Sequence, residues 1–249
     1  MKKTIITLMA LAGVVSADTF TMSDLVSSGT LGEGVSQDVS YADTVYTFTN
    51  KGAITEITNS ELLDAFKATS GYITIAAWVN QTEGSEDAIF SVGGQNDGLK
   101  FALKDDCLQV TTKGTKDTTT SLAVTQGNTT TPAWTLVAVT ISLDSAGTST
   151  FFTGSNGYTS LSSEDKSIGG WTTPSNNYFA IGSGNGNGNR DLFEGQIANL
   201  TIITSSTAAT ADSIKTLMGN TAPKLVPEPT TATLSLLALA GLAARRRRR

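Results

Sequence analysis

The sequence contains no histidine among its 249 residues. This excludes nucleophilic sites of the Ser-His-Asp or Cys-His type and zinc sites that depend on imidazole. Cysteine is almost absent too. Cys107 stands alone, so no disulfide can form within the chain and the fold must rest on its hydrophobic core. Charged residues make up only 16% of the chain. Much of the remainder is Thr, Ser, Gly and Asn, which is typical of β-rich extracellular domains.

The hydrophobic fraction of 39% is enough for one buried core and argues against a wholly disordered chain. A chain of this length forms one large domain or two small ones. The sequence shows neither a linker that would separate two domains nor an internal repeat, so we expect a single folded domain over residues 18–222.

The cations are concentrated at the two ends of the chain. Lys2 and Lys3 lie at the start and Arg245–Arg249 at the end, which leaves the body from Asp18 to Val226 with 10 cations against 21 anions, a net charge of −11. A body this acidic repels phosphate backbones, so nucleic acid is not an expected partner.

The first 17 residues are predicted to be a secretory signal peptide. Two lysines precede an apolar run over residues 4–15, and small residues stand just before Asp18. A cationic start, an apolar stretch of about 12 residues and small residues at the −3 and −1 positions are the signature of such a peptide, with cleavage after Ala17. The alternative is a buried N-terminal helix. It is disfavoured because such a helix would begin with two lysines.

Residues 223–249 have the composition of a membrane-directed tail. An uncharged segment over residues 230–244 is followed directly by Arg245–Arg249. The segment is shorter than the roughly 20 residues that span a bilayer comfortably, and its arginines would remain on the cytoplasmic side. The alternative is that Leu234–Leu242 form a helix packed in the core. Five consecutive arginines would then repel one another at one end of that helix.

This tail resembles the PEP-CTERM sorting signal of Gram-negative bacterial surface proteins. The resemblance rests on Pro227, Glu228 and Pro229, the short hydrophobic segment and the arginine-rich end, in that order. It implies an exosortase as partner, a transient anchor in the inner membrane, cleavage near the Pro-Glu-Pro motif, and export to the cell surface or extracellular matrix.

Between these two ends the chain is predicted to be all-β, an antiparallel sandwich with one or two short helices. Short apolar runs alternate with Gly, Asn and Asp turns, and Leu99, Phe101 and Leu103 alternate with more polar neighbours. Looser patterns over residues 18–57 suggest edge strands. The clearest strands are expected over residues 72–79, 88–92, 99–103, 108–112, 134–143, 148–153, 178–181 and 196–203.

Two helices have support in the sequence. Thr58 and Glu61 form a capping-box pattern before an apolar face, and a second helix is expected from Thr210 to Gly219.

The body also resembles laminin-G-like, concanavalin A-like jelly rolls. The resemblance covers about residues 40–222 and rests on the runs ITIAAWV at 73–79, WTLVAVT at 134–140 and FEGQIANLTI at 193–202. It implies a jelly-roll fold that hosts glucanases, lectins and inert scaffolds alike, so the fold alone does not decide the function.

The acidic residues do not show the spacing of a glycan-cleaving site. Retaining glycosidases need two facing carboxylates about 5–5.5 Å apart, which on one strand means residues two or four positions apart. Glu83, Glu86 and Asp87 are expected in a turn, and Glu164 and Asp165 in a polar loop. No Glu-x-Asp-x-Glu spacing of the kind that glucanases of this fold use is present.

The glycine-rich segment 182–188 lacks both the Gly-x-Gly-x-x-Gly spacing and the following helix of a phosphate loop. One interpretation is a flexible loop between strands. The other is a calcium site that uses Asp191, Asn189 and carbonyl oxygens, with Asp97 as a further donor, because these are hard oxygen ligands and related jelly rolls often hold calcium near a strand end.

Trp171 lies in a polar, glycine-bordered loop, where it could stack on a sugar ring or close the end of the sandwich. Trp78 and Trp134 fall inside apolar runs and are expected in the core. Cys107 has no basic neighbour and is expected to be a buried, inert thiol. Together these features predict an exported, non-catalytic surface or matrix protein that binds a glycan or a protein. The alternative is a glycan-cleaving enzyme of the same fold.

Overall fold

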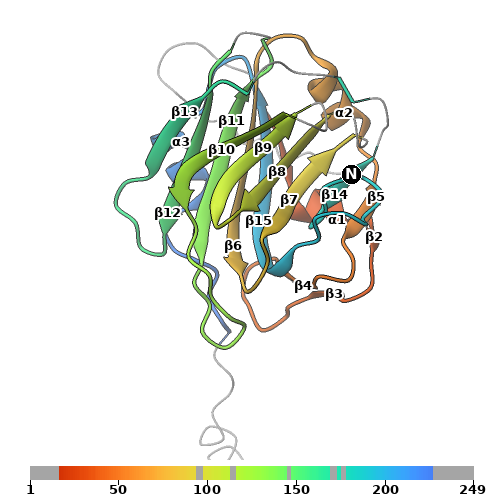
Figure 1. The fold of residues 1–249 in the computed structure, drawn as a ribbon, viewed down its shortest axis with the longest axis vertical. Coiled ribbons are helices and arrows are strands. Elements are labelled where there is room, and N and C mark those ends of the chain that lie inside the picture. Colours follow the sequence, from red (N-terminus) through yellow and green to blue (C-terminus); the bar gives the residue numbers. More distant parts are fainter. Residues whose placement is uncertain are drawn as a thin grey trace, which may run out of the picture.

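The computed structural model describes residues 17–93, 98–112, 116–144, 147–168, 173–174 and 178–226. Within these ranges the chain forms two antiparallel sheets packed face to face, with three short helices around them (Figure 1). The predicted all-β antiparallel sandwich is confirmed.

The first sheet has eight strands, and its long central strands read as continuous apolar runs. Its order is β13-β12-β11-β6-β15-β4-β3, and β1 pairs with the far half of β15. The strands are β1 (Asp18–Thr21), β3 (Val35–Gln37), β4 (Val45–Thr49), β6 (Tyr72–Gln81), β11 (Thr135–Ser142), β12 (Ser149–Ser155), β13 (Ser162–Lys166) and β15 (Glu194–Ser205).

The second sheet has seven strands in the order β10-β9-β8-β7-β14-β5-β2 and faces the viewer in Figure 1. The strands are β2 (Thr30–Leu31), β5 (Ile54–Ile57), β7 (Glu86–Val92), β8 (Leu99–Lys104), β9 (Cys107–Thr112), β10 (Lys116–Ala123) and β14 (Phe179–Ile181).

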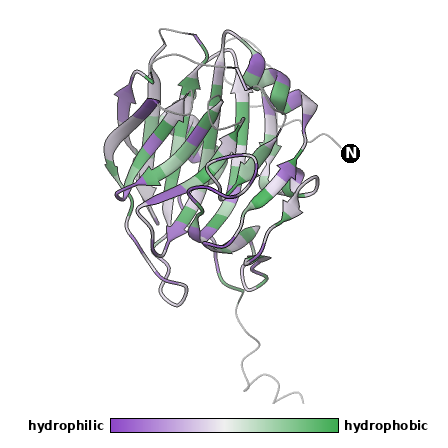
Figure 2. Cartoon of the chain, turned by 45° about the vertical axis from the view of Figure 1, so that its right-hand side comes forward, coloured by the Kyte–Doolittle hydropathy of each residue, from purple (hydrophilic) through white to green (hydrophobic). Residues whose placement is uncertain are grey.

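The main core lies between the sheets and follows the two-residue period of the strands. Leu99, Phe101 and Leu103 of β8 belong to this core, as their alternation predicts. Residues of high and low hydropathy follow one another along the strands in Figure 2. The intervening Lys100 is only 9% exposed, so β8 is not the half-exposed strand that its sequence suggests.

A second apolar cluster covers the outer face of the first sheet. Trp78 and Trp134 are buried there as expected, together with Tyr41 and Tyr158. The helix α3 (Ala211–Met218) lies over this face with Ile214 turned inward. The Trp78 indole N–H donates to the carbonyl of Met218 over 3.3 Å, and the Tyr158 hydroxyl donates to that of Gly219 over 2.7 Å.

The described ranges contain three helices where one or two were expected. The additional one, α1 (Met22–Val26), follows a capping box between Thr21 and Asp24. The helix α2 (Ser60–Lys67) is confirmed, but the prediction that Thr58 caps it is wrong. Asn59 is the N-cap, and its side-chain oxygen accepts from the backbone N–H of Leu62 over 2.9 Å.

Two further local predictions are wrong, the first of them only in part, because strand pairing overrides local composition. The expectation of edge strands over residues 18–57 holds for β2 and β3, which end the two sheet orders, but β4 and β5 each have a partner on both sides and are interior strands. Glu164 and Asp165 belong to the edge strand β13 and not to a loop, since β12 supplies a full set of partners for them.

Several expectations fall outside the described residues: most of the signal peptide, Asp97, Trp171 and the motif Pro227–Glu228–Pro229. Of the two residues at the expected cleavage site, Ala17 is the first described residue and Asp18 begins β1. Among the helices of the described ranges, none is long and apolar enough to cross a membrane.

Candidate functional site

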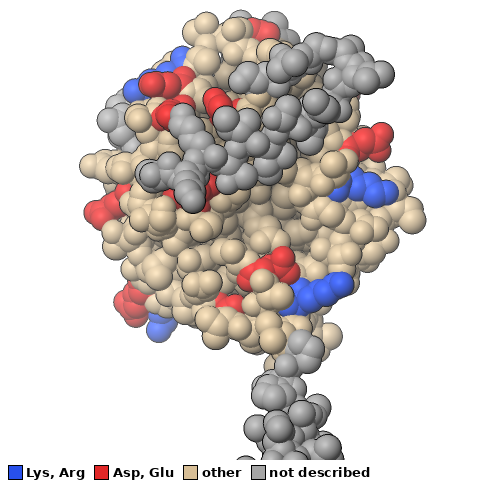
Figure 3. All heavy atoms as spheres, turned by 180° about the vertical axis from the view of Figure 1, so that it is seen from behind, with Lys and Arg blue, Asp and Glu red and all other residues tan. Residues whose placement is uncertain are grey.

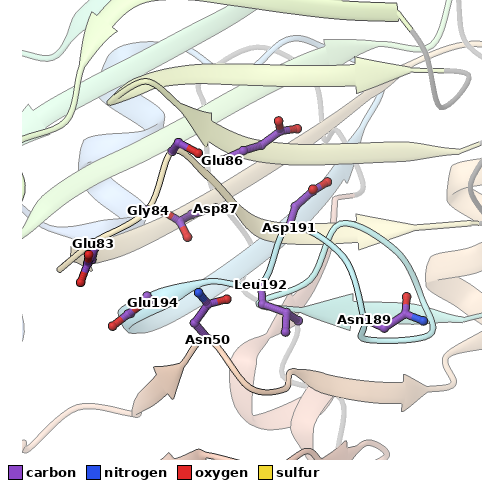
Figure 4. A pocket seen from close by; sticks show the side chains of 10 residues that line it. Asn50, Glu83, Gly84, Glu86, Asp87, Asn189, Asp191, Leu192 and Glu194 are labelled. Carbon is purple, nitrogen blue, oxygen red and sulfur yellow. The ribbon is translucent and has the colours of Figure 1, made fainter.

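An acidic pocket of about 550 Å³ opens where β4 ends and β7 and β15 begin (Figure 4). Three chain segments far apart in the sequence supply its wall. The lining residues are Asn50, Glu83, Gly84, Ser85, Glu86, Asp87, Asn189, Asp191, Leu192 and Glu194. Five of these side chains are carboxylates and one is aliphatic, so the pocket offers mainly hydrogen-bond acceptors.

Glu86 and Asp87 are consecutive residues of β7 and therefore point to opposite faces of the sheet. Glu86 pairs in register with Lys104 and Asp87 pairs with Leu103, whose side chain is in the core. Glu86 accordingly points outward toward β8, and Asp87 points toward the other sheet (Figure 4). Both had been expected in a turn, whereas the structure places them at the start of a strand.

Lys100 joins β7 to the loop that precedes β15. Its ammonium donates to the Glu86 carboxylate and, over 3.0 Å, to Oδ2 of Asp191. Lys104 donates to the other oxygen of Glu86 over 3.0 Å. Burial raises the pKa of Glu86, but the hydrogen bonds and charges of the two lysines outweigh burial and leave the pKa below its usual value.

Asp87 has the opposite environment. It is 1% exposed, and burial raises its pKa to about 6. Hydrogen bonds from the Gln81 side chain and the Glu194 backbone oppose the rise, while the charges of Glu194 and Asp106 add to it. A Cβ on Gly84 would lie 2.0 Å from an Asp87 carboxylate oxygen, and Gly84 has φ +127°, so only glycine fits beside this carboxyl group.

The segment 182–191 connects β14 to β15 and is closely hydrogen-bonded. Ser183 Oγ and the Gly184 N–H both donate to the carbonyl of Arg190, over 3.1 and 2.8 Å. A Cβ on Gly184 would lie 2.5 Å from Asp191 Oδ2 and 3.1 Å from Lys100 Cδ. The glycine therefore lets the loop lie directly on the Lys100 ion pair.

Asn189 and Asp191, the residues expected to bind calcium, both line this pocket. Asn189 Oδ1 accepts from the Asn185 side chain over 3.0 Å, and Asp191 is paired with Lys100. A lysine ammonium beside Asp191 opposes a second cation there. Within the described ranges no three His, Cys, Asp or Glu side chains are grouped to hold a metal ion. Calcium binding by Asn189 and Asp191 stays a prediction.

Sequence reasoning missed Lys100, Glu194 and the inward-facing Asp87 as parts of one site. No local motif marks them, because they meet only through the pairing of β7 with β8 and of β15 with β4. Cys107 is half-buried, so the expectation of a buried thiol is wrong: the residue begins β9 beside a turn and its side chain lies on the outer face of the sheet.

A laminin G profile, described as the concanavalin A-like lectin/glucanases superfamily, matches residues 51–215. This chain belongs to that superfamily. The match lies inside the region expected to be one domain and includes β15, which completes the first sheet. Among curated proteins, none matches the sequence.

Two solved structures share the fold of this superfamily member at low identity. The receptor-binding domain of the botulinum neurotoxin C/D mosaic serotype is 14% identical with a TM-score of 0.51, over 81% of this chain and 46% of that one. The binding domain of botulinum neurotoxin serotype G is 13% identical with a TM-score of 0.50, over 80% and 46%. The chain thus spans less than half the length of these structures, and the similarity shows the fold alone.

Proposed function

We propose that the protein is an exported, non-catalytic binding domain of the bacterial surface or extracellular matrix, and that it binds a glycan or a protein segment. The observation that carries the proposal is the acidic pocket, which is open and lined from three separate segments, and in which the carboxylates of Glu86 and Asp191 both bind the Lys100 ammonium. The superfamily includes lectins as well as glucanases, so its membership is consistent with binding.

The chemistry of the pocket suits a ligand rich in hydroxyl or amino donors. Asn50, Glu83, Asn189 and Glu194 present side-chain oxygens around it, and Leu192 offers one apolar contact. Sugar hydroxyls and the cationic or amide groups of a polypeptide both donate to such oxygens. The pocket therefore has the composition of a polar recognition site.

The alternative, a glycan-cleaving enzyme, is favoured by one observation. Asp87, with its pKa raised to about 6, and Glu86, with its pKa lowered, have separated proton affinities of the kind found in acid and base pairs. Against it, the two side chains point to opposite faces of β7, and Lys100 and Lys104 both donate to Glu86. They are not placed to flank one glycosidic bond.

The test of binding is a glycan array probed with the full chain, with and without calcium, and repeated with Asp191→Asn. Asp64→Asn on the exposed face of α2 is the matched control, because it removes one carboxylate at a distance from the pocket. We expect binding that Asp191→Asn weakens and the control leaves intact, and loss in calcium-free buffer would assign the metal. Release of reducing sugar from any polysaccharide would overturn the non-catalytic proposal.

We propose that the signal peptide directs export and that the tail, a PEP-CTERM signal acted on by an exosortase, holds the protein transiently in the inner membrane. Support comes from the sequence alone. Mass spectrometry of the mature protein should find Asp18 at the N-terminus and no Arg245–Arg249. Cell fractionation that recovers a cytoplasmic product retaining Met1 would contradict export.

A further inference from the structure

The last described residues form a short ribbon with an early loop of the chain. The Ala42 N–H donates to the carbonyl of Lys224 over 2.9 Å, and the Val226 N–H donates to the carbonyl of Ser40 over 2.7 Å. Tyr41 and Leu225 form an antiparallel bridge between these two bonds. The chain is therefore fixed to the domain up to Val226.

The loop half of the ribbon is itself well held. Oδ1 of Asp38 accepts from the backbone N–H of Ser40 over 3.1 Å, and its Oδ2 accepts from Gln196 of β15 over 3.0 Å. The side chain of Tyr41 packs edge-on against Trp134, with ring centroids 5.8 Å apart. Val39 consequently projects from a turn that both the sheet and the second apolar cluster support.

Exposed apolar side chains gather on this ribbon. Val39 is 83% exposed, Leu225 59% and Val226 50%. Within the described part of the chain only two other large hydrophobic residues, Leu31 and Tyr178, are exposed. The ribbon lies at the end of the molecule where the described chain finishes, opposite α2 (Figure 1), and basic and acidic side chains stand beside that point on a face that is otherwise mostly uncharged (Figure 3).

The sequence after Val226 determines what can lie close to these exposed apolar side chains. The uncharged segment that leads to the five arginines begins at Thr230, four residues after Val226. Four extended residues span at most about 14 Å. If the tail lies in a bilayer, the ribbon is therefore held within that distance of the membrane surface, where valine and leucine side chains partition favourably.

We propose that the apolar patch of Val39, Leu225 and Val226 docks into the surface of the bilayer that holds the tail, and so fixes which end of the domain faces the membrane. This inference rests on the proposed function, since it needs the tail in a membrane. The occupant is the lipid surface, because the fixed ribbon and the short connection bring the patch there before any other partner can reach it.

The test uses the full chain with Cys107→Ser, which removes the half-buried thiol, and a single new cysteine labelled with an environment-sensitive dye. Val39→Cys reports on the patch. Ser70→Cys, exposed before β6 at the opposite end of the molecule, is the matched control. Each protein is mixed with vesicles of phosphatidylethanolamine and phosphatidylglycerol, and flotation records whether the chain binds them.

We expect a blue shift and quenching by nitroxide lipids at position 39 but not at position 70. If the chain floats but the dye at position 39 is as exposed to water as the dye at position 70, docking of the patch is contradicted. The tail anchor is then still supported. A chain that does not float contradicts both the anchor and the bilayer as occupant. A blue shift that depends on protein concentration and needs no vesicles assigns the patch to a second copy instead.

Discussion

The surroundings of Asp87 favour the neutral form of its carboxyl group. It lies between the two sheets, and its amide partner Gln81 has a side-chain oxygen that is buried without a hydrogen-bond partner. The folded protein binds the Asp87 proton more tightly than the unfolded chain, in which an aspartate has a pKa near 3.9. Ionisation of this residue therefore costs stability.

The first prediction concerns pH. Between about pH 4 and pH 7 the folded state holds this proton longer than the unfolded state, so the Asp87 contribution lowers the free energy of unfolding by roughly 2–3 kcal/mol as pH rises. Asp87→Asn should remove this decline and stabilise the protein at pH 7 by roughly 1–3 kcal/mol, since an amide can also donate to the Gln81 oxygen. Urea unfolding at pH 4.5 and 7 measures both effects, and an unchanged pH profile in the variant would contradict the assignment.

A second prediction concerns Lys100. Lys100→Met should lower the free energy of unfolding by roughly 2–3 kcal/mol, because Glu86 and Asp191 would lose their shared cation in a partly buried site. Lys104→Met is the control: Lys104 pairs with Glu86 alone and a third of its side chain is exposed, so its loss should cost less than about 1 kcal/mol. Equal urea midpoints for the two variants would show that Lys100 is not the central cation of this site.

These residue-scale relations could not be predicted from the sequence. The alternation in β8 predicts that Lys100 faces away from the core, which is correct, but only the register with β7 and the path of the loop before β15 explain its burial. Asp191 and Asn189 were expected at a functional site and do lie in the pocket. Glu194 gives no local signal, because it lines the pocket only through the pairing of β15 with β4.

The helices show how much of a single element can be predicted from local sequence patterns. The apolar face of α2 was correctly predicted, with Leu62, Leu63 and Phe66 buried, but its capping residue was placed one position early. The same kind of capping pattern, Thr21 followed by Asp24, precedes α1 and would have predicted that helix. The strands β10 and β13 are rich in Thr, Ser and charge, so apolar alternation does not mark them.

A third prediction tests the cap of α2. Asn59→Ala should lower the free energy of unfolding by about 1 kcal/mol, because the N–H of Leu62 would lose its acceptor at the helix start. Thr58→Ala should have an effect within about 0.5 kcal/mol, as is usual for positions outside such contacts. Thermal melts of the two variants make the comparison. A larger loss in Thr58→Ala would support the cap expected from the sequence.

At the scale of the whole molecule, the segment after β15 covers an otherwise apolar sheet face. A fourth prediction follows: a chain ending at Ser205 should expose Trp78, Trp134 and Tyr158, lose about 3 kcal/mol or more and melt roughly 6–12 °C lower. A chain ending at Val226 is the control, because it keeps α3 and the ribbon with residues 40–42. Calorimetry and binding of a hydrophobic dye measure the difference. Equal melting temperatures would show that α3 is dispensable.

The fold class could be predicted from the sequence because the core strands are long and apolar and are separated by recognisable turns. The order of the strands was not, since neighbours in the sheets are often distant in the chain. β6 lies between β11 and β15, and β14 lies between β7 and β5. Such pairings depend on how the two sheet faces fit together, which residue spacing does not encode.

The strand order also determines when the protein can fold during its synthesis. Among the strands of the described ranges β15 is the last to be made, yet it joins β6 on one side to β4 and β1 on the other. Until residues 194–205 emerge, the first sheet consists of separate pieces and β1 has no partner. Pairing at such long range is slow. The first sheet of this chain therefore cannot be completed until synthesis has passed residue 205, so its core closes late.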